Sequence, residues 1–187
     1  MDAIKLYEDY NYSVEDIYAL PDGKRAEIID GRWYDMAPPS PNHQRIISII
    51  HWRLKDYIKK TGGDCEVFPA PFAVFLNADD RNYVEPDIAV VCDPSRIDDQ
   101  GLKGAPDLVV EVVSPSSKRM DYYIKLFKYR TAGVREYWVV NPLTKVSNVF
   151  YFDDDEEKAD GDQVSFDDPL TSHIYPDFSI RIADEFS

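Results

Sequence analysis

The chain has 187 residues, of which 44% are hydrophobic and 13% aromatic, and its formal net charge is −14. This length and composition predict a globular fold with a core of its own and argue against a disordered chain. The negative charge argues against binding a polyanion by simple electrostatic attraction. No apolar run is long enough to span a bilayer, so we expect no membrane contact and a cytoplasmic location.

The first third of the chain carries three sets of capping and turn signals. They predict a short helix capped by Ser13, a hairpin over residues 26–36 that turns at Asp30-Gly31, and a long helix from Ser40 to near Gly62.

Apolar runs rich in β-branched residues predict the strands. These runs are 65–76, 87–92, 107–113, 135–141, 146–152, 163–166 and 178–186. A second long helix, capped by Ser116 or Ser117, is expected to end at Gly133. The α+β order predicts a mixed sheet flanked by helices in a single domain over residues 1–187.

Two local features of the sequence are an acidic segment near the C-terminus and a pair of cysteines. Residues 153–168 hold nine acidic residues and one lysine, and we expect residues 153–160 to form a solvated loop. The two cysteines, Cys65 and Cys92, have neither zinc-site spacing nor the number of a disulfide framework. We therefore expect both to be small core residues.

Glu111 lies at the centre of the strand 107–113, whose neighbouring residues are apolar on both faces. Such a strand is covered on both sides, so the carboxylate loses hydration at a cost of several kcal/mol or so unless something compensates. A structural cation, a raised pKa or a metal ion are the three candidates.

A second carboxylate could share a metal ion with Glu111. Asp107 is on the same strand, but four residues at about 3.3 Å each separate the two by roughly 13 Å, too far for one ion. Asp87 begins another strand; if that strand pairs beside 107–113, at about 4.8 Å, Asp87 and Glu111 converge. The backbone carbonyl of Val112 could add an oxygen ligand, an arrangement that suits magnesium.

The predicted helix after this strand supplies a cation. Asp121, Lys125 and Tyr129 are spaced four residues apart and form one row on a helix. Lys125 could place its ammonium near developing phosphate charge, which would complete the parts for metal-assisted phosphodiester hydrolysis. Lys125 could also be a plain ion-pair partner of Asp121 or Glu111, and Lys118 is a rival for the catalytic lysine.

Several segments resemble the Uma-two family of the PD-(D/E)XK restriction-endonuclease-like superfamily. They include "YVEPDIAVV", "GAPDLVVEVVSPSS" and "DYYIKLFKYRTAGVREYWVVNP". The resemblance implies an α/β core with a central mixed sheet. It also implies an endonuclease that depends on Mg²⁺ or Mn²⁺ and acts on nucleic acid, with DNA the first expectation.

The resemblance also assigns roles to residues. Asp87 and Glu111 would hold the metal, Glu27 would be an additional acidic residue, and His43 matches the histidine that opens the long helix. The superfamily lysine is expected two residues after Glu111, where this chain has a valine, so the resemblance implies that Lys125 replaces it. Plain structural readings also exist: a strand-entry turn for Asp87, an exposed strand position for Glu27, and local helix-end bonding for His43.

Two other functions stay open on the sequence alone. The fold could be a catalytically inactive binding or assembly module, or a hydrolase of a small phosphorylated molecule. If the chain cuts duplex DNA, two sites are needed, which makes a homodimer an expectation by analogy.

Overall fold

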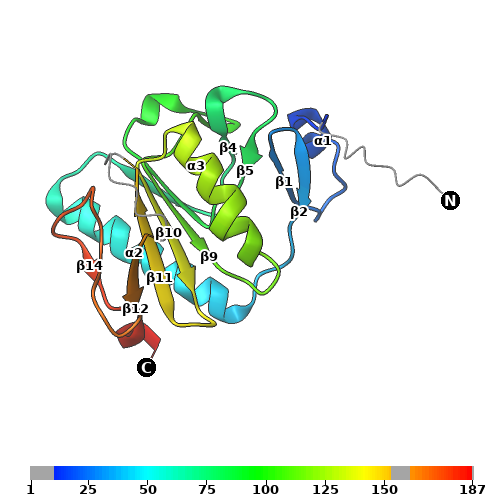
Figure 1. Ribbon diagram of the computed structural model, residues 1–187. Helices are drawn as coiled ribbons and strands as arrows, with labels where there is room; N and C mark the ends of the chain where they lie inside the picture. Colours follow the sequence, from blue (N-terminus) through cyan, green and yellow to red (C-terminus); the bar gives the residue numbers. More distant parts are fainter. Residues whose placement is uncertain (1–10, 153–160, 187) are drawn as a thin grey trace.

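The computed structural model describes residues 11–152 and 161–186, so the predicted acidic loop 153–160 lies outside the described residues. Two six-stranded sheets and a two-stranded one make up the strands, and the helices α2 (Pro41–Thr61) and α3 (Leu126–Ala132) are prominent around them (Figure 1). The predicted mixed sheet flanked by helices is confirmed. Within the described residues, no helix is both long and apolar enough to cross a membrane.

The central sheet has the strand order β12-β11-β10-β9-β6-β3. Its strands are β3 (Glu66–Pro69), β6 (Ile88–Val91), β9 (Leu108–Val112), β10 (Glu136–Asn141), β11 (Val146–Tyr151) and β12 (Asp162–Ser165). The pair β9–β10 is parallel and the other pairs are antiparallel. Every residue of β9 is buried, as its apolar run predicts for a strand covered on both faces.

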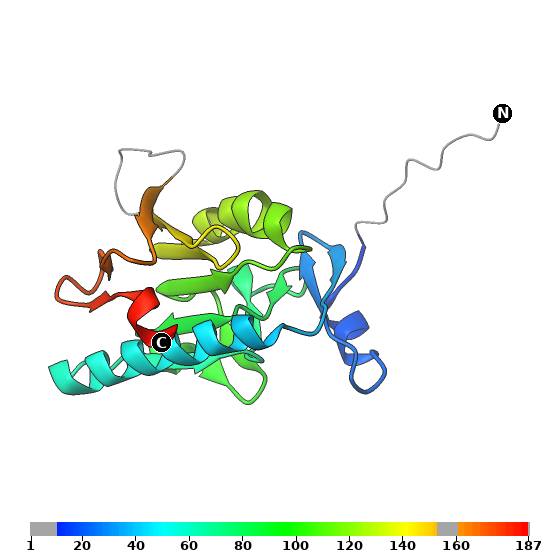
Figure 2. The same cartoon turned by 90° about the horizontal axis from the view of Figure 1, so that it is seen from below.

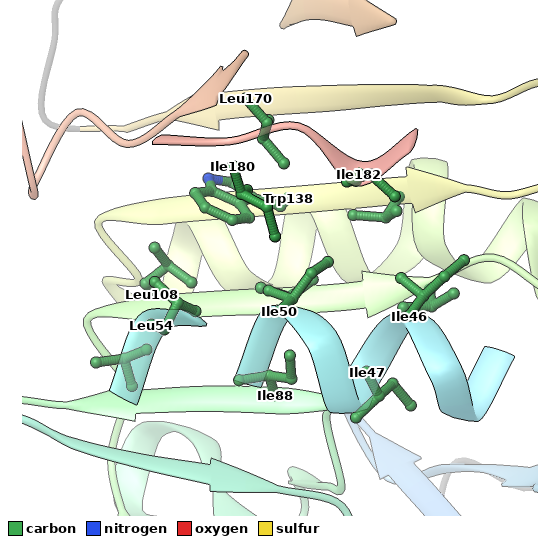
Figure 3. Packing of buried hydrophobic residues seen from close by; sticks show 14 of the residues in the cluster. Ile46, Ile47, Ile50, Leu54, Ile88, Leu108, Trp138, Leu170, Ile180 and Ile182 are labelled. Carbon is green, nitrogen blue, oxygen red and sulfur yellow. The ribbon is translucent and has the colours of Figure 1, made fainter. Parts of the chain in front are cut away.

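Helix α2 covers one face of the central sheet. Ser40 caps it by accepting a hydrogen bond from the His43 backbone N–H, and Gly62 ends it with a left-handed φ of 71°. Its apolar side packs against the sheet in one cluster (Figure 3), which includes Ile46, Ile50, Leu54, Ile88, Leu108 and Trp138. Each such side chain contributes about 1.5–3 kcal/mol when fully buried.

Helix α3 covers the opposite face, so the sheet lies between α2 and α3 (Figure 2). The helix 118–132 was predicted as one regular element, but the segment η3 (Met120–Lys125) is π-helical and α3 follows it. Gly133 ends the element with a φ of 95°, as predicted. π-Helical turns are rare and occur often at functional sites.

The second sheet has the order β2-β1-β5-β4-β8-β7 and lies beside the central sheet. Its strands are β1 (Ala26–Ile29), β2 (Arg32–Asp35), β4 (Val74–Phe75), β5 (Tyr83–Val84), β7 (Ile97–Asp98) and β8 (Gly101–Lys103). The predicted hairpin turn is confirmed, because Asp30 and Gly31 both have positive φ, at 52° and 76°. Short helices α1 (Val14–Tyr18), η1 (Leu76–Ala78) and η2 (Pro94–Arg96) flank these strands.

The C-terminal region departs from the prediction of one strand over 178–186. It forms β14 (Ser179–Ile180), paired with β13 (Leu170–Thr171), and then the 3-10 helix η4 (Ile182–Phe186). The alternating apolar residues that suggested a strand are buried, but the backbone turns after residue 180.

A fully buried carboxylate fastens the region around residues 172–174 to the central sheet. Glu136 of β10 accepts hydrogen bonds from the Trp138 ring N–H at 2.6 Å, the Ser172 hydroxyl at 2.8 Å, and the backbone N–H groups of His173 and Ile174 at 3.0 Å. All four bonds end on the two oxygens of one side chain, which satisfies its burial.

The expectation for the cysteines is wrong. Cys65 and Cys92 form a disulfide, with a Cα–Cα distance of 4.0 Å. The cause is the antiparallel register of β3 and β6, which pairs Glu66 with Val91 and therefore places the next residues outward, the two cysteines, opposite each other. Sequence spacing could not reveal this pairing, because 27 residues separate them.

Candidate active site

Asp87 and Glu111 lie opposite each other on neighbouring strands. The antiparallel pair β6–β9 aligns Ile88 with Val110, so continuing the register by one residue sets Asp87 across from Glu111. Directly opposed residues share a face of the sheet, with Cβ atoms about 5 Å apart. The Val112 backbone N–H donates to Asp87 Oδ2 at 2.7 Å, which fixes the aspartate at this edge.

A cleft of about 820 Å³ opens at this point, and both carboxylates line it. Its walls come from residues 34–44 between β2 and the start of α2, from the beginning of β6, and from the end of β9 through the start of η3. Among residues 11–152 and 161–186, six carboxylates and two fixed cations, Arg25 and Lys125, line the cleft, so the formal charge of this lining is −4 with His43 neutral.

Lys125 lies buried between two carboxylates from distant parts of the chain. Its Nζ donates to Glu111 Oε1 at 2.8 Å and to Glu27 Oε1 at 2.9 Å. Tyr129, one turn further along the helix, donates its hydroxyl to the same Glu111 oxygen at 2.7 Å. Glu27 also accepts the Glu85 backbone N–H at 3.0 Å, so Glu27 fixes Lys125 more than it faces the cleft.

The charges of this cluster do not balance. Burial lowers the pKa of Lys125. The charges of Glu111, Glu27 and Asp121 outweigh burial, so the net pKa lies well above its ordinary value. Burial raises the pKa of Glu111 well above the ordinary range, the Lys125 charge lowers it, and the nearby acids Asp87, Asp121 and Glu27 raise it again. One ammonium faces several carboxylates, so the cluster retains protons that an added cation would displace.

His43 stands beside Asp87. Its Nε2 lies 3.2 Å from Asp87 Oδ2, and its other ring nitrogen, Nδ1, is buried and has no hydrogen-bond partner in the part of the chain that the structure describes. Burial lowers the pKa of His43, but the hydrogen bond and charge of Asp87 outweigh it and raise the net value, with a contribution from the Val112 carbonyl. The imidazole can therefore carry a proton close to neutral pH beside the cleft.

Asp121 is a cleft carboxylate that the sequence analysis did not assign to the site. It lies in the π-helical turn, buried, and accepts the Ser117 hydroxyl at 2.5 Å. Burial raises its pKa, the Lys125 charge and the Ser117 hydrogen bond offset part of that rise, and the net pKa is about 6. The spacing to Lys125 was the available signal, but it suggested a direct ion pair, whereas Lys125 donates to Glu27 and Glu111 instead.

The lining of the cleft fits a hard divalent cation. Oδ1 of Asp87 and Oε2 of Glu111 accept no hydrogen bond from residues 11–152 or 161–186. No group of three or more His, Cys, Asp or Glu side chains in those ranges forms a ready metal cage. Two carboxylates suffice for Mg²⁺, which keeps several waters and takes phosphate oxygens from its substrate.

Comparison with known proteins places the chain in a family. Residues 14–183 match the model of the Uma2 family, whose description is "Putative restriction endonuclease". The chain belongs to the Uma2 family. Membership supports a nuclease function in general terms.

Two of the proteins that the chain resembles add to the family match. "Uncharacterized protein slr1290" from Synechocystis sp. is 30% identical over 135 residues, which cover 71% of this chain and 68% of that protein. A crystal structure from Anabaena variabilis, called a "putative nuclease belonging to DUF820", has a TM-score of 0.71 and 18% identity. The match covers 93% of this chain and 97% of that chain, which shows that the two share a fold.

Three other residues of this Uma2 protein, Asp107, Lys118 and Val112, were also considered for the site. Asp107, at the opposite end of β9, accepts the Cys92 backbone N–H at 2.8 Å and lies outside the cleft. Lys118 is exposed and does not line the cleft, unlike Lys125. Val112 lines the cleft, but its N–H binds Asp87 and its carbonyl lies near the His43 ring.

Proposed function

We propose that this chain is a divalent-metal-dependent nuclease that hydrolyses phosphodiester bonds in nucleic acid, DNA first, with its reaction centre at Asp87 and Glu111. The observation that supports it is the meeting of these two carboxylates, opposed across β6 and β9, at an open acidic cleft that also holds Lys125 and His43. Family membership adds support, because restriction-endonuclease-like proteins generally use divalent metals.

Each of the chain's own residues has a role in the proposal. Asp87 and Glu111 would hold Mg²⁺ or Mn²⁺ through their unbonded oxygens. Lys125, fixed by Glu27, keeps a permanent positive charge beside Glu111 and would stabilise the negative charge that develops on the phosphate. His43 could move a proton at its Nε2, because its raised pKa keeps it partly protonated near neutral pH. The cation, when bound, would supply charge that activates water and polarises the phosphate.

The proposal is tested by plasmid nicking with Mg²⁺ or Mn²⁺. Glu111→Gln and Asp87→Asn keep the side-chain shape and should each lower the cleavage rate at least about a hundredfold. Asp107→Asn is the matched control, because Asp107 also follows a proline at the end of an apolar strand but lies outside the cleft. Cleavage by folded Glu111→Gln protein at the wild-type rate would refute the assignment.

The two lysines need separate treatment in that assay. Lys118→Ala should leave the cleavage rate of fully bound DNA unchanged, even if binding weakens, which would remove the rival for the catalytic lysine. Lys125→Ala leaves Glu27 and Glu111 buried without their cation, at a cost of about 3–5 kcal/mol. Its activity must therefore be measured below the melting temperature of the variant.

The alternative function is a catalytically inactive binding or assembly module. The observation in its favour is that Lys125 already compensates Glu27 and Glu111. Metal binding separates the two functions, since a cation at about 100 times its Kd stabilises the folded protein by about 2.7 kcal/mol. If millimolar Mg²⁺ or Mn²⁺ leaves the melting temperature of wild type unchanged, as it should for Asp87→Asn, the result would favour the inactive module.

Assembly and location belong to the proposal as well. Cutting both strands of a duplex takes two sites, so a homodimer is proposed for that substrate, and sedimentation velocity would detect it. A monomer at micromolar concentration would limit the enzyme to one strand per encounter. The cytoplasm stays the proposed compartment.

A further inference from the structure

The outward side of the helix that carries Lys125 is basic and aromatic. Its exposed residues between 118 and 131 are Lys118, Arg119, Tyr123, Phe127, Arg130 and Thr131. None of these is acidic, although the whole chain carries −14. The acidic and the remaining basic side chains of this helix, Asp121, Lys125 and Lys128, are buried.

Two aromatic rings are unusually open on this side. Tyr123 is 71% exposed and Phe127 is 67% exposed, and they are four residues apart. Neither ring contacts another ring among residues 11–152 and 161–186. Because neither ring is buried, a large apolar area stays in contact with water. Packing within the fold therefore does not explain why both residues are aromatic.

The helix behind these rings is held rigidly. Lys125 and Tyr129 are fixed to Glu111 on the inner side, and the Tyr137 hydroxyl donates to the Asp121 carbonyl at 3.0 Å. A platform for stacking needs such a fixed support, because ordering a mobile helix would cost binding free energy.

The platform continues from the cleft. Ser116, Ser117 and Met120 line the cleft, and Tyr123 follows Met120 by less than one helical turn. Tyr123 lies in the π-helical turn and Phe127 in the α-helix that follows it, and both rings are exposed. Unpaired bases can stack on exposed rings of this kind, and the exposed Arg119 one turn earlier offers a positive charge for a phosphate.

We propose that Tyr123 and Phe127 form a stacking platform for an unpaired nucleic-acid strand that leaves the cleft past Met120. The inference rests on the proposed function, because it takes the cleft as the place where that strand is bound. It narrows the substrate to a single strand, or to a duplex with a single-stranded arm, since paired bases do not expose their faces to side chains. The exposed basic side chains of this helix complement the phosphates of a nucleic-acid strand, whereas two copies of a chain of net charge −14 repel each other.

Fluorescence anisotropy with a labelled 20-nucleotide oligo(dT) tests the platform in Ca²⁺, and a blunt hairpin duplex serves as the paired probe. Tyr123→Ala and Phe127→Ala should each weaken oligo(dT) binding about tenfold, because a stacked base contributes on that scale. Tyr123→Phe should restore the affinity. Trp52→Ala is the matched control, since Trp52 is 56% exposed on α2 across the sheet, and it should change nothing.

Salt dependence separates stacking from charge. Arg119→Ala should flatten the slope of log affinity against log salt by about 0.7, the contribution of one phosphate contact to a single strand. The two alanine variants at the aromatic positions should lower affinity with an unchanged slope. Equal binding by Tyr123→Ala and Trp52→Ala, or tighter binding of the hairpin, overturns the inference.

Two further outcomes are distinguishable. If the Tyr123→Ala/Phe127→Ala protein sediments as a monomer where wild type is a dimer, and oligo(dT) affinity is unchanged, the surface joins two copies and the inference is wrong. If oligo(dT) binding depends on both rings but no cleavage occurs with Mg²⁺ or Mn²⁺, the platform stands and the proposed nuclease function fails. If cleavage occurs but neither cleavage nor oligo(dT) binding depends on the two rings, the proposed nuclease function stands and the platform fails.

Discussion

Asp121 links the protonation of the cleft to the stability of the fold. Its pKa is about 6 in the folded protein, against about 3.9 in an unfolded chain. Between these values the folded state binds more protons than the unfolded state, so this residue's contribution to stability falls as pH rises from about 4 to about 6.

Urea unfolding in EDTA measures this contribution. Raising the pH from 4.5 to 7 should lower the free energy of unfolding of wild type by about 2 kcal/mol more than that of Asp121→Asn. Glu66→Gln removes an exposed carboxylate and should follow wild type. Parallel pH curves for wild type and Asp121→Asn would show that Asp121 is ionised throughout the range.

At the scale of single residues, the sequence predicts the chemistry of the site better than its contacts. An apolar strand interrupted by Glu111 indicated that the carboxylate needs compensation by a cation, a raised pKa or a metal ion, and in the structure Lys125 donates to it. The contact between Lys125 and Glu27 spans 98 residues of sequence, and no local pattern indicates such a distance. Asp121 was noticed for its spacing, but its position in the cleft depends on a π-helical turn.

The disulfide joins two elements, β3 and β6, at the edge of the central sheet. It joins residues 27 positions apart, for which restriction of the unfolded chain gives a stabilisation of about 3.5 kcal/mol. Cys65→Ser/Cys92→Ser should lower the free energy of unfolding in urea by about that amount. Dithiothreitol should destabilise wild type similarly and leave the double variant unchanged; an equal response of both proteins would contradict the bond.

At the scale of elements, capping and turn residues predicted helix ends and hairpins reliably. Ser40 with Gly62, and Asp30 with Gly31, lie where their backbone preferences place them. The short strands β7 and β8 were not predicted, because two or three paired residues leave no periodic pattern. The C-terminal segment alternates like a strand, yet its core contacts can be made by a strand followed by a 3-10 helix.

Charge is unevenly distributed over the whole molecule, and this should make substrate binding depend on divalent ions. The described lining of the cleft carries a formal charge of −4, whereas the helical segment 118–132 has Lys118, Arg119 and Arg130 exposed. A polyanion can approach the helix but is repelled at the cleft until cations neutralise it.

Oligonucleotide binding with and without Ca²⁺ tests this dependence. Affinity in 5 mM Ca²⁺ should exceed that in EDTA by about tenfold at matched ionic strength. Glu111→Gln/Asp87→Asn reduces the negative charge of the cleft and should bind more tightly than wild type in EDTA while losing most of the response to Ca²⁺. A response to Ca²⁺ that NaCl reproduces would indicate general screening instead.

The burial of both faces of β9 follows from a pattern visible in the sequence, but the order of the strands in the sheet was not predicted. The division of the strands into two six-stranded sheets does not, because it depends on which short strands pair across long loops. The site forms where both sheets meet, with Glu27 from one and Glu111 from the other.

The π-helical turn has a consequence for insertions and deletions. A turn closed by bonds five residues apart holds one residue more than a regular turn. Deleting one residue between Met120 and Lys125 would let the helix become regular without rotating the residues before it, because the wide turn already takes up the extra residue. Deleting one residue from the regular first turn of α3 would instead rotate everything before it by about 100° relative to Tyr129. Lys125 and Asp121 would then turn away from Glu111, so the chain should tolerate a one-residue deletion better in η3 than in α3.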